Sequence, residues 1–268
     1  MSQGNYANLN GLKLYYEIHG DGRPLVLLHG GFGVIGMYGQ ILPELSKTYQ
    51  VIAVELEGHG HTALLDRPLS FEQMADDIAA LIGHLKLAQA DVMGYSLGGG
   101  VALQTAIRHP DSVRKAVIVS APCKSDGWYP EDHAGMRAVN GQVAKTWVGS
   151  PMHEDYTKVA PRPEDWPTLA DKMGQFLGQD YDWSKEVAGL KTPMMIVIGD
   201  ADAVRPAHAV EFFELLGGGK TGARWDGSGM ANSRLAILPG TTHYVSFASP
   251  LLPHLVTQFL DAPMPDAR

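Results

Sequence analysis

Short apolar runs alternate along most of the chain with longer segments whose apolar residues recur at helical spacing. A continuous apolar run is typical of a strand that is buried on both faces of a sheet. Such runs occur at residues 25–28, 51–56, 90–93, 115–120, 193–198 and 233–238, and helical patterns occur at 41–49, 70–85, 97–109, 206–216 and 251–260. Strands that alternate with helices form βαβ units with right-handed connections. The pattern therefore predicts an α/β fold with a mostly parallel, doubly wound sheet.

Two short motifs predict where individual elements turn or begin. Residues 6–9 and 12–18 are strand-like and are joined by Asn10-Gly11, a dipeptide that strongly favours a tight hairpin turn. Ser70, followed by Gln73, predicts the start of a helix, because the two residues can form a capping box. The chain is thus expected to open with a β-hairpin before the parallel strands.

The alternation of strands and helices stops between residues 122 and 191. This stretch has no buried strand, and it contains Trp128, Trp147, Trp166 and Trp183. We expect a mostly helical insertion that lies over the site as a lid, so that residues 1–121 and 192–268 form the core domain and 122–191 form the cap. Trp147 and Trp166 are then candidates to bind the substrate. The alternative is a helical subdomain whose aromatic side chains only fill its own small core.

A second irregular stretch, at residues 217–232, is rich in glycine and predicts a flexible loop. It contains Gly217-Gly218-Gly219-Lys220-Thr221, which looks like the end of a phosphate-binding loop. The match fails because residue 214 is Glu where such a loop requires glycine, and because the segment follows a helix rather than a strand.

Composition and charge describe an ordinary globular chain of 268 residues. Hydrophobic residues make up 45% and charged residues 19%, and the acids behind the net charge of −8 are scattered, so we expect no nucleic-acid partner. Neither a signal peptide nor an apolar stretch long enough to cross a bilayer is visible, so we expect no membrane association. The sequence leaves a homodimer open.

Cys123 is the single cysteine of the chain. It excludes an intrachain disulfide and favours a reducing compartment, so we expect a cytoplasmic protein. Since no histidine pattern lies near it in the sequence, we expect Cys123 to be structural rather than catalytic.

Residues 91–100 contain a motif that is typical of a serine nucleophile. They include Gly94-Tyr95-Ser96-Leu97-Gly98, a G-x-S-x-G match that follows an apolar run and precedes a helical one, as the motif requires. The serine must project from a sharp turn where chain segments approach closely, so a side chain at Gly94 or Gly98 would collide. The backbone N–H of Leu97, at the start of the helix, can face a developing oxyanion. We therefore predict Ser96 as the nucleophile.

Other marked residues follow the predicted strands at their carboxyl ends. They are the Gly30-Gly31 turn, Glu57-Gly58, the pair Asp200 and Asp202, and His243. Because ligands bind beyond the carboxyl ends of parallel strands, we expect these residues to meet at one edge of the sheet. His29, His59 and His61 also lie in these turns, but they lack the spacing of metal ligands. We expect them to be structural or exposed, and we expect neither a metal nor a cofactor.

Together, these motifs resemble those of the α/β-hydrolase fold superfamily over nearly the full length of the chain. The motifs at 29–30, 94–98, 199–202 and 239–243 stand in the order of the family's His-Gly turn, nucleophile elbow, acid loop and histidine loop. The chain is similar to serine esterase-like members that carry a helical cap. The resemblance implies a sheet of the α/β-hydrolase type with an inserted helical cap.

The resemblance also implies a Ser-Asp-His triad. Ser96 would be the nucleophile, and His243 would act first as general base and then as general acid. Asp202 would orient the imidazole and stabilise its cation. Asp200 is the alternative acid, but the family places the acid three residues after the glycine, which favours Asp202.

The same resemblance implies an oxyanion hole. Its donors would be the backbone N–H groups of Gly31 and Leu97, with Phe32 as the alternative to Gly31. Phe32, beside this turn, is also expected to contact the substrate. His29 in this motif is expected to be structural.

A serine at the elbow favours acyl-type chemistry. Haloalkane dehalogenases and epoxide hydrolases of the superfamily carry an aspartate there, and proline iminopeptidases carry a proline and a tryptophan where this chain has Phe32 and Leu97. We therefore expect hydrolysis of a carboxylic ester or lactone of a small to medium apolar substrate, because the insertion is rich in Trp and Met. Hydrolysis of a C–C bond in a diketone by the same triad, and a ligand-binding protein on a hydrolase fold, are the alternatives.

Overall fold

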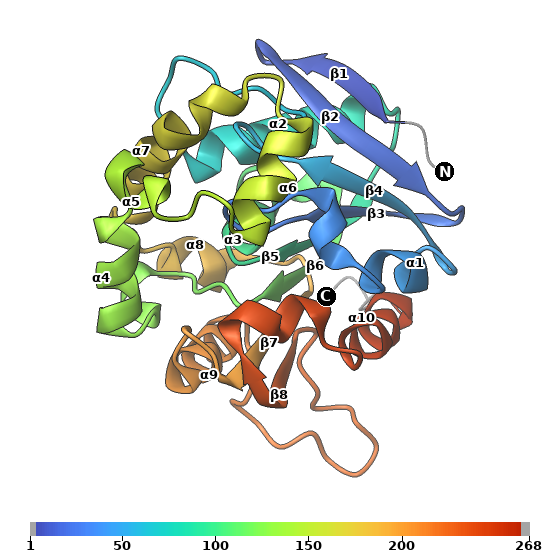
Figure 1. Cartoon of the computed structure of the whole chain (residues 1–268). Coiled ribbons are helices and arrows are strands. Elements are labelled where there is room, and N and C mark those ends of the chain that lie inside the picture. Colours follow the sequence, from blue (N-terminus) through green and yellow to red (C-terminus); the bar gives the residue numbers. More distant parts are fainter. Residues whose placement is uncertain (1–3, 264–268) are drawn as a thin grey trace.

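The computed structural model describes residues 4–263, and its centre is a single sheet (Figure 1). The sheet has eight strands in the order β1-β2-β4-β3-β5-β6-β7-β8. They are β1 (Asn5–Leu9), β2 (Leu12–His19), β3 (Arg23–Leu28), β4 (Tyr49–Glu55), β5 (Ala90–Tyr95), β6 (Val113–Val119), β7 (Met194–Ala201) and β8 (Arg234–Thr242). β2 pairs antiparallel with β1 and with β4, and all the other pairs are parallel. The mostly parallel sheet predicted from the sequence is confirmed.

Helices cover both faces of the sheet, as a doubly wound fold requires. Those outside the insertion are α1 (Ile41–Leu45), α2 (Phe71–His84), α3 (Leu97–Arg108), α9 (Pro206–Leu215) and α10 (Leu252–Asp261). Alternate residues of β3 show the division. Val26 and Leu28 lie in the core formed with α2, α3 and α9, whereas Leu25 and Leu27 lie in the core formed with α1 and α10. Both faces of β3 are therefore buried, which is why the strand is a continuous apolar run in the sequence.

The two short motifs behave as predicted. Asn10 and Gly11 both have positive φ angles, of 49° and 81°, and Leu9 pairs with Leu12 across them. Two consecutive residues with positive φ form the type I′ turn that the right-handed twist of a hairpin favours. At the start of α2, Oγ of Ser70 accepts the backbone N–H of Gln73 at 3.1 Å, which satisfies one of the free donors at the helix N-terminus.

Two element ends lie four residues from their predicted positions. The helix expected at 41–49 ends at Leu45, because Tyr49 pairs with Arg23 of β3 and the chain must already be extended there. The last strand continues past Leu238 to Thr242, which pairs with Ala201 beyond a register shift in β7. β8 is an edge strand, so its outer side has no neighbouring strand to pair with. An edge strand can therefore accommodate Pro239, which has no backbone N–H.

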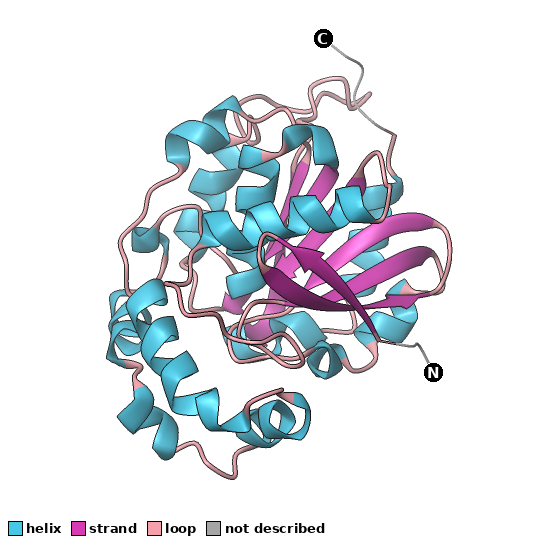
Figure 2. Ribbon diagram, turned by 90° about the horizontal axis from the view of Figure 1, so that it is seen from above, coloured by secondary structure: helices cyan, strands magenta, loops and turns pink. Residues whose placement is uncertain are grey.

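The chain between β6 and β7 is helical, as predicted. It forms α4 (Pro130–Ala138), α5 (Gly141–Lys145), α6 (Pro151–Val159), α7 (Trp166–Leu177) and α8 (Ser184–Gly189). Helices α4 and α5 both pack on α7, and the three lie to the left of the sheet in Figure 1. Figure 2 shows the sheet from above, with a group of helices beside it. Nζ of Lys172 on α7 donates to the carbonyls of Leu65 and Arg67 at 2.6 and 2.8 Å. These bonds join the insertion to the loop that precedes α2.

The glycine-rich stretch at 217–232 forms an irregular loop between α9 and β8, as predicted. Its Trp225 is 98% exposed. No helix in the described part of the chain is long and apolar enough to cross a membrane.

Candidate active site

Ser96 occupies a strained turn between β5 and α3. Its φ and ψ angles are 52° and −114°, a backbone conformation that a non-glycine residue adopts only when the surroundings impose it. A Cβ on Gly94 would lie 1.9 Å from the carbonyl oxygen of Gly98, and a Cβ on Gly98 would lie 2.4 Å from that of Leu28. The predicted close approach of chain segments at both glycines is therefore confirmed.

The structure brings Ser96, His243 and Asp202 together from three separate parts of the chain. Oγ of Ser96 lies 3.1 Å from Nε2 of His243, and Nδ1 of His243 lies 2.8 Å from Oδ1 of Asp202. Because an ionised carboxylate only accepts hydrogen bonds, Nδ1 carries the imidazole proton and Nε2 is free to accept the proton of Ser96. His243 and Asp202 are 7% and 4% exposed. This arrangement can take a proton from a serine hydroxyl.

The carboxylate of Asp202 is held by donors on both of its oxygens. Oδ1 accepts from His243 and from the backbone N–H of Val204 at 3.1 Å, and Oδ2 accepts from the backbone N–H of Gly199 at 3.0 Å and from Oγ of Ser120 at 2.5 Å. Burial acts to raise the pKa of Asp202, but the hydrogen bonds from His243, Ser120 and Gly199 outweigh it and lower the pKa below its usual value. Asp202 is therefore a buried anion next to the imidazole.

Asp200 has a different environment. Its carboxylate faces the histidine loop and accepts the backbone N–H groups of Gly240 and Thr241 at 3.0 and 3.1 Å. These backbone hydrogen bonds lower the pKa of Asp200. Asp200 thus joins the ends of β7 and β8, whereas Asp202 is the acid that bonds to His243. This geometry agrees with the preference for Asp202 that the sequence gives.

The Gly30-Gly31 turn passes next to Ser96. A Cβ on Gly30 would lie 3.5 Å from Cβ of Ser96, and the backbone N–H of Gly33 closes the turn onto the carbonyl of Gly30 at 3.0 Å. Leu97 is the first residue of α3, so its N–H has no partner within the helix. The two segments that carry the predicted oxyanion donors, Gly31 and Leu97, therefore flank the serine.

His29 fixes the start of this turn. It is fully buried, and its Nε2 accepts the backbone N–H of Leu56 at 3.0 Å. The proton must then be on Nδ1, which lies 2.7 Å from the carbonyl of Gly30. Burial, assisted by neighbouring His59, lowers the pKa of His29 to about 3. His29 is therefore a neutral structural residue, as expected.

No metal centre accompanies these histidines. His59 is also fully buried, and burial lowers its pKa to about 4, while Nδ1 of His61 pairs with the Glu55 carboxylate at 2.8 Å. Within residues 4–263, no three His, Cys, Asp or Glu side chains are grouped in a way that would hold a metal ion.

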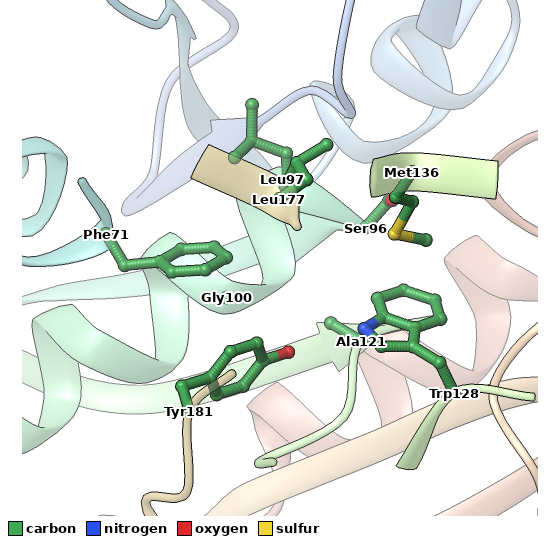
Figure 3. Close-up of a pocket in the computed structure, with 9 residues that line it drawn as sticks. All are labelled: Phe71, Ser96, Leu97, Gly100, Ala121, Trp128, Met136, Leu177 and Tyr181. Carbon is green, nitrogen blue, oxygen red and sulfur yellow. The ribbon is translucent and has the colours of Figure 1, made fainter. Parts of the chain in front are cut away.

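A small apolar pocket opens beside Ser96 (Figure 3). Its walls come partly from the core and partly from the helical insertion. The core residues are Phe71, Leu97, Gly100 and Ala121, and the insertion residues are Trp128, Met136, Leu177 and Tyr181. Its free volume is about 20 Å³, which is room for about one water molecule. None of these lining side chains carries a charge.

The three residues predicted to bind the substrate, Phe32, Trp147 and Trp166, are not among those that line this pocket. The ring of Phe32 packs edge-on against Trp147 and Trp166, with centroids 5.4 Å apart in both cases. Trp166 is 2% exposed, and its Nε1 donates to the carbonyl of Ala144 at 3.1 Å. Trp166 is therefore a core residue, whereas Phe32 and Trp147 are half-buried and pack against that core. The sequence marks Trp128 and Tyr181 only as aromatic residues of the insertion, and nothing in their spacing sets them apart.

Cys123 has a histidine neighbour that the sequence does not reveal. Nε2 of His208, on α9, lies 3.7 Å from Sγ of Cys123 and accepts the backbone N–H of the same residue at 3.2 Å. Burial raises the pKa of the thiol to about 12, so the thiolate that a nucleophile requires does not form at neutral pH. The expectation that Cys123 is structural agrees with this geometry, although the reason based on absent histidines was wrong.

Comparisons with known proteins agree with this fold. A family model described as the alpha/beta hydrolase fold matches residues 23–151. The AB hydrolase superfamily protein YisY of Bacillus subtilis is 30% identical over 217 residues, which cover 73% of this chain and 80% of that protein. The chain belongs to the α/β-hydrolase family. This membership makes the protein a hydrolase in the general sense, but it does not fix the bond or the substrate.

Two further similarities concern other α/β hydrolases. The pimeloyl-[acyl-carrier protein] methyl ester esterase of Neisseria meningitidis serogroup B is 40% identical over 111 residues, which are 41% of each chain. The crystal structure of E-2-(acetamidomethylene)succinate hydrolase aligns with 98% of this chain and 100% of its own, with a TM-score of 0.75 and 21% identity. The second likeness shows that this α/β hydrolase has the same fold as that enzyme.

Proposed function

We propose that the protein is a serine hydrolase that cleaves carboxylic esters or lactones through an acyl-enzyme on Ser96. The observation that carries the proposal is the continuous hydrogen-bonded chain from Ser96 through His243 to Asp202. The partial similarity to a methyl ester esterase supports an ester as the substrate. The same triad would serve hydrolysis of a C–C bond in a diketone, which is the alternative reaction.

In the proposed mechanism, Oγ of Ser96 attacks the carbonyl carbon of the ester while Nε2 of His243 takes the hydroxyl proton. The carbonyl oxygen becomes an oxyanion, which the N–H groups of Gly31 and Leu97 stabilise. His243 then gives its proton to the alkoxide, and the alcohol leaves. A water molecule attacks the acyl-enzyme by the same route, releases the acid and restores Ser96.

Asp202 contributes to both halves of this cycle. Its hydrogen bond to Nδ1 keeps the imidazole in the tautomer whose Nε2 can accept a proton, and its negative charge stabilises the imidazolium that forms. The lowered pKa of Asp202 keeps the carboxylate ionised at neutral pH. Asp202 itself does not need to take up a proton.

The pocket beside Ser96 favours a small, uncharged and apolar group on the substrate. Phe71, Trp128, Met136 and Tyr181 are among its walls, and no lysine, arginine or histidine lines it. A carboxylate placed there would lose its hydration without gaining a cationic partner. This environment supports substrates with a neutral acyl group over substrates whose acyl group carries a carboxylate of its own.

We also propose that residues 122–191 act as a cap over a core formed by 1–121 and 192–268. Met136 on α4 and Leu177 on α7 close the pocket from the side of the insertion. Because the pocket has room for about one water, a substrate can reach Ser96 only if these side chains move. Closure of the cap over a bound substrate would exclude bulk water from the acyl-enzyme.

The test combines covalent labelling with turnover. A fluorophosphonate should label wild-type protein and should not label Ser96→Ala. Turnover is measured with p-nitrophenyl esters of increasing chain length, a lactone and a meta-cleavage diketone. Ser96→Ala should lose activity by several orders of magnitude while keeping its fold. A well-folded Ser96→Ala protein with near-normal turnover would falsify the mechanism, and a wild-type protein that binds esters without cleaving them would indicate a ligand-binding protein.

A further inference from the structure

The second carboxylate oxygen of Asp202 is held by a serine that has no part in the proposed mechanism. Oγ of Ser120 lies 2.5 Å from Oδ2 of Asp202 and 2.7 Å from Oγ of Ser246. Ser120 directly follows β6, and Ser246 lies in the short 3-10 helix after His243. Both serines are 0% exposed. The three side chains therefore form a closed group from which water is excluded.

Counting protons fixes the direction of these hydrogen bonds. The backbone N–H groups of Gly199 and Val204 can only donate, and each donates to one oxygen of Asp202, so both oxygens of the carboxylate are acceptors. Ser120 has a single hydroxyl proton and must give it to Oδ2. Its oxygen can then only accept, so the 2.7 Å contact requires Ser246 to be the donor.

Ser246 also reaches back to the histidine that the carboxylate orients. Its Oγ lies 3.1 Å from the carbonyl oxygen of His243, longer than its 2.7 Å distance to Ser120. The single hydroxyl proton of Ser246 is therefore shared between two acceptors. The shorter distance favours the hydrogen bond to Ser120 over the one to the carbonyl of His243. The hydroxyl of Tyr95 donates to the same carbonyl at 2.9 Å, so the carbonyl of His243 keeps a partner when Ser246 turns toward Ser120.

We propose that Ser246 and Ser120 form a positioning relay that donates, in that order, to Oδ2 of Asp202 and fixes the carboxylate against His243. The proposal rests on the proposed function, since it assumes that Asp202 is the triad acid. Both serines are positioning residues, because neither contacts the substrate pocket or the reacting atoms.

The backbone of Ser120 supports this role. Its φ angle is 53°, a left-handed conformation that is strained for a residue other than glycine. Glycine would adopt the same conformation without that strain. The hydroxyl is the feature that glycine cannot supply, and in this structure the hydroxyl is directed at Asp202.

Loss of the relay would free the carboxylate on one side. In Ser120→Ala, Oδ2 keeps only the N–H of Gly199, and one buried acceptor site is left empty. The carboxylate can then turn about its side-chain bonds, and the imidazole of His243 loses part of its alignment with Ser96. A small misplacement of a catalytic group typically lowers the rate of the chemical step rather than the affinity for substrate.

The first experiment compares the pH dependence of ester hydrolysis in wild type, Ser120→Ala, Ser246→Ala and the double variant. For Ser120→Ala we expect kcat to fall about tenfold with KM unchanged. The acid limb of kcat/KM should move to higher pH, because a carboxylate with one donor fewer holds the imidazolium proton more tightly. Ser246→Ala should show a smaller change in the same direction. The double variant should come close to Ser120→Ala alone, because Ser246 reaches Asp202 only through Ser120 and the carbonyl of His243 keeps its hydrogen bond from Tyr95.

Two tyrosine side chains in the described part of the chain also lie against His243, and they do not alter the interpretation of this pH profile. They are Tyr95, whose ring lies 5.4 Å away, and Tyr244, whose ring lies 5.5 Å away. Burial raises the pKa of Tyr95 further, and phenols are neutral below about pH 8. Tyr95 therefore does not contribute to the acid limb.

Ser233→Ala is the matched control. Ser233 is also buried, at 3% exposure, and its Oγ accepts the N–H of Met194 at the other end of β7. Its loss should lower the melting temperature without altering the pH profile. Wild-type kcat and an unshifted acid limb in folded Ser120→Ala would overturn the relay, as would additive effects in the double variant.

A second readout needs no substrate, and it separates failure of the relay from failure of the proposed function. The proton on Nδ1 of His243 gives a low-field NMR signal, which should shift in Ser120→Ala and in Ser246→Ala but not in Ser233→Ala. If the wild type neither reacts with a fluorophosphonate nor cleaves esters, the proposed function fails, yet this signal still tests the hydrogen bonds. A signal that is the same in all variants would overturn the relay.

Discussion

Nδ1 of His243 lies 2.8 Å from Oδ1 of Asp202, although 41 residues separate them in the chain. Asp200, which is only two residues before Asp202, binds the backbone of Gly240 and Thr241 instead. The two acids therefore have different partners: Asp202 bonds to the imidazole, and Asp200, at the end of β7, bonds to the backbone of β8 just before His243. This division leads to a direct test by substitution.

We expect Asp202→Asn to lower kcat strongly, by about four orders of magnitude at most, with little change in KM. The amide no longer selects the tautomer of His243 and no longer stabilises its cation. Asp200→Asn should have a mild effect, mainly on stability, since it removes only a contact between the ends of β7 and β8. Kinetics and melting temperatures of the two variants are measured side by side. If the two phenotypes are reversed, the acid of the triad is Asp200.

Trimming the pocket should change the preference among ester chain lengths. Trp128→Ala and Met136→Ala enlarge the space beside Ser96, so we expect longer acyl chains to become better substrates than in wild type. Trp166→Ala is the control, because Trp166 is 2% exposed and lies in the core of the insertion. It should lower the melting temperature, as a large-to-small core substitution does, and keep the wild-type preference. The same chain-length profile in all three variants would refute the role given to the pocket.

Two glycines should respond in opposite ways to replacement by alanine. A Cβ on Gly98 would lie 2.4 Å from the carbonyl oxygen of Leu28, whereas nothing lies within 4 Å of one on Gly83 in α2. Gly98→Ala should therefore disturb the turn at Ser96 and reduce both activity and stability. Gly83→Ala should raise the free energy of unfolding by about 0.5–1 kcal/mol, because alanine favours the helix. Denaturation and esterase assays on both variants are sufficient, and a fully active Gly98→Ala protein would contradict the packing at the elbow.

Asp77 on α2 should make stability depend on pH. Burial raises the pKa of its carboxyl to about 6 in the folded protein. The folded protein disfavours the charged form of Asp77, so this group destabilises the fold by its full amount above pH 6. The destabilisation disappears as the pH falls toward the pKa near 4 that the carboxyl has in the unfolded chain. Asp77→Asn should raise the free energy of unfolding at pH 8, by up to about 2 kcal/mol, and much less at pH 4.5.

The adjacent residue provides the opposite control for that experiment. Asp76 pairs with Arg108 at 2.9 Å, and this partner lowers the pKa of Asp76. Its charge stabilises the fold above the unfolded pKa, so Asp76→Asn should lower stability slightly at pH 8. Urea denaturation at the two pH values measures both effects. A higher free energy of unfolding for Asp76→Asn at pH 8, or a lower one for Asp77→Asn, would contradict the environments described for these two residues.

Much of the fold was predictable because its determinants are local. Both faces of β3 and β5 are covered by helices, so most positions of these strands are apolar, and the run at 25–28 shows β3 directly. The elbow is only partly local: Gly94 is required by its approach to Gly98, whereas Gly98 is required by the carbonyl of Leu28 at the end of β3. The boundaries of α1 and β8 were missed because the register with β3 and β7 sets them, and local periodicity does not contain that register.

The amino-acid sequence by itself determined the class of fold, the residue that can attack and the order in which its partners follow along the chain. Only the tertiary structure decided which insertion residues face Ser96, that Asp202 rather than Asp200 reaches His243, and that Ser120 and Ser246 meet behind the carboxylate. The physical reason is the range of the interactions. Ser120 and Asp202 are 82 residues apart, and Ser120 and Ser246 are 126 apart. Contacts at such separations depend on strand register and on how helices pack, and no pattern within a single segment records them.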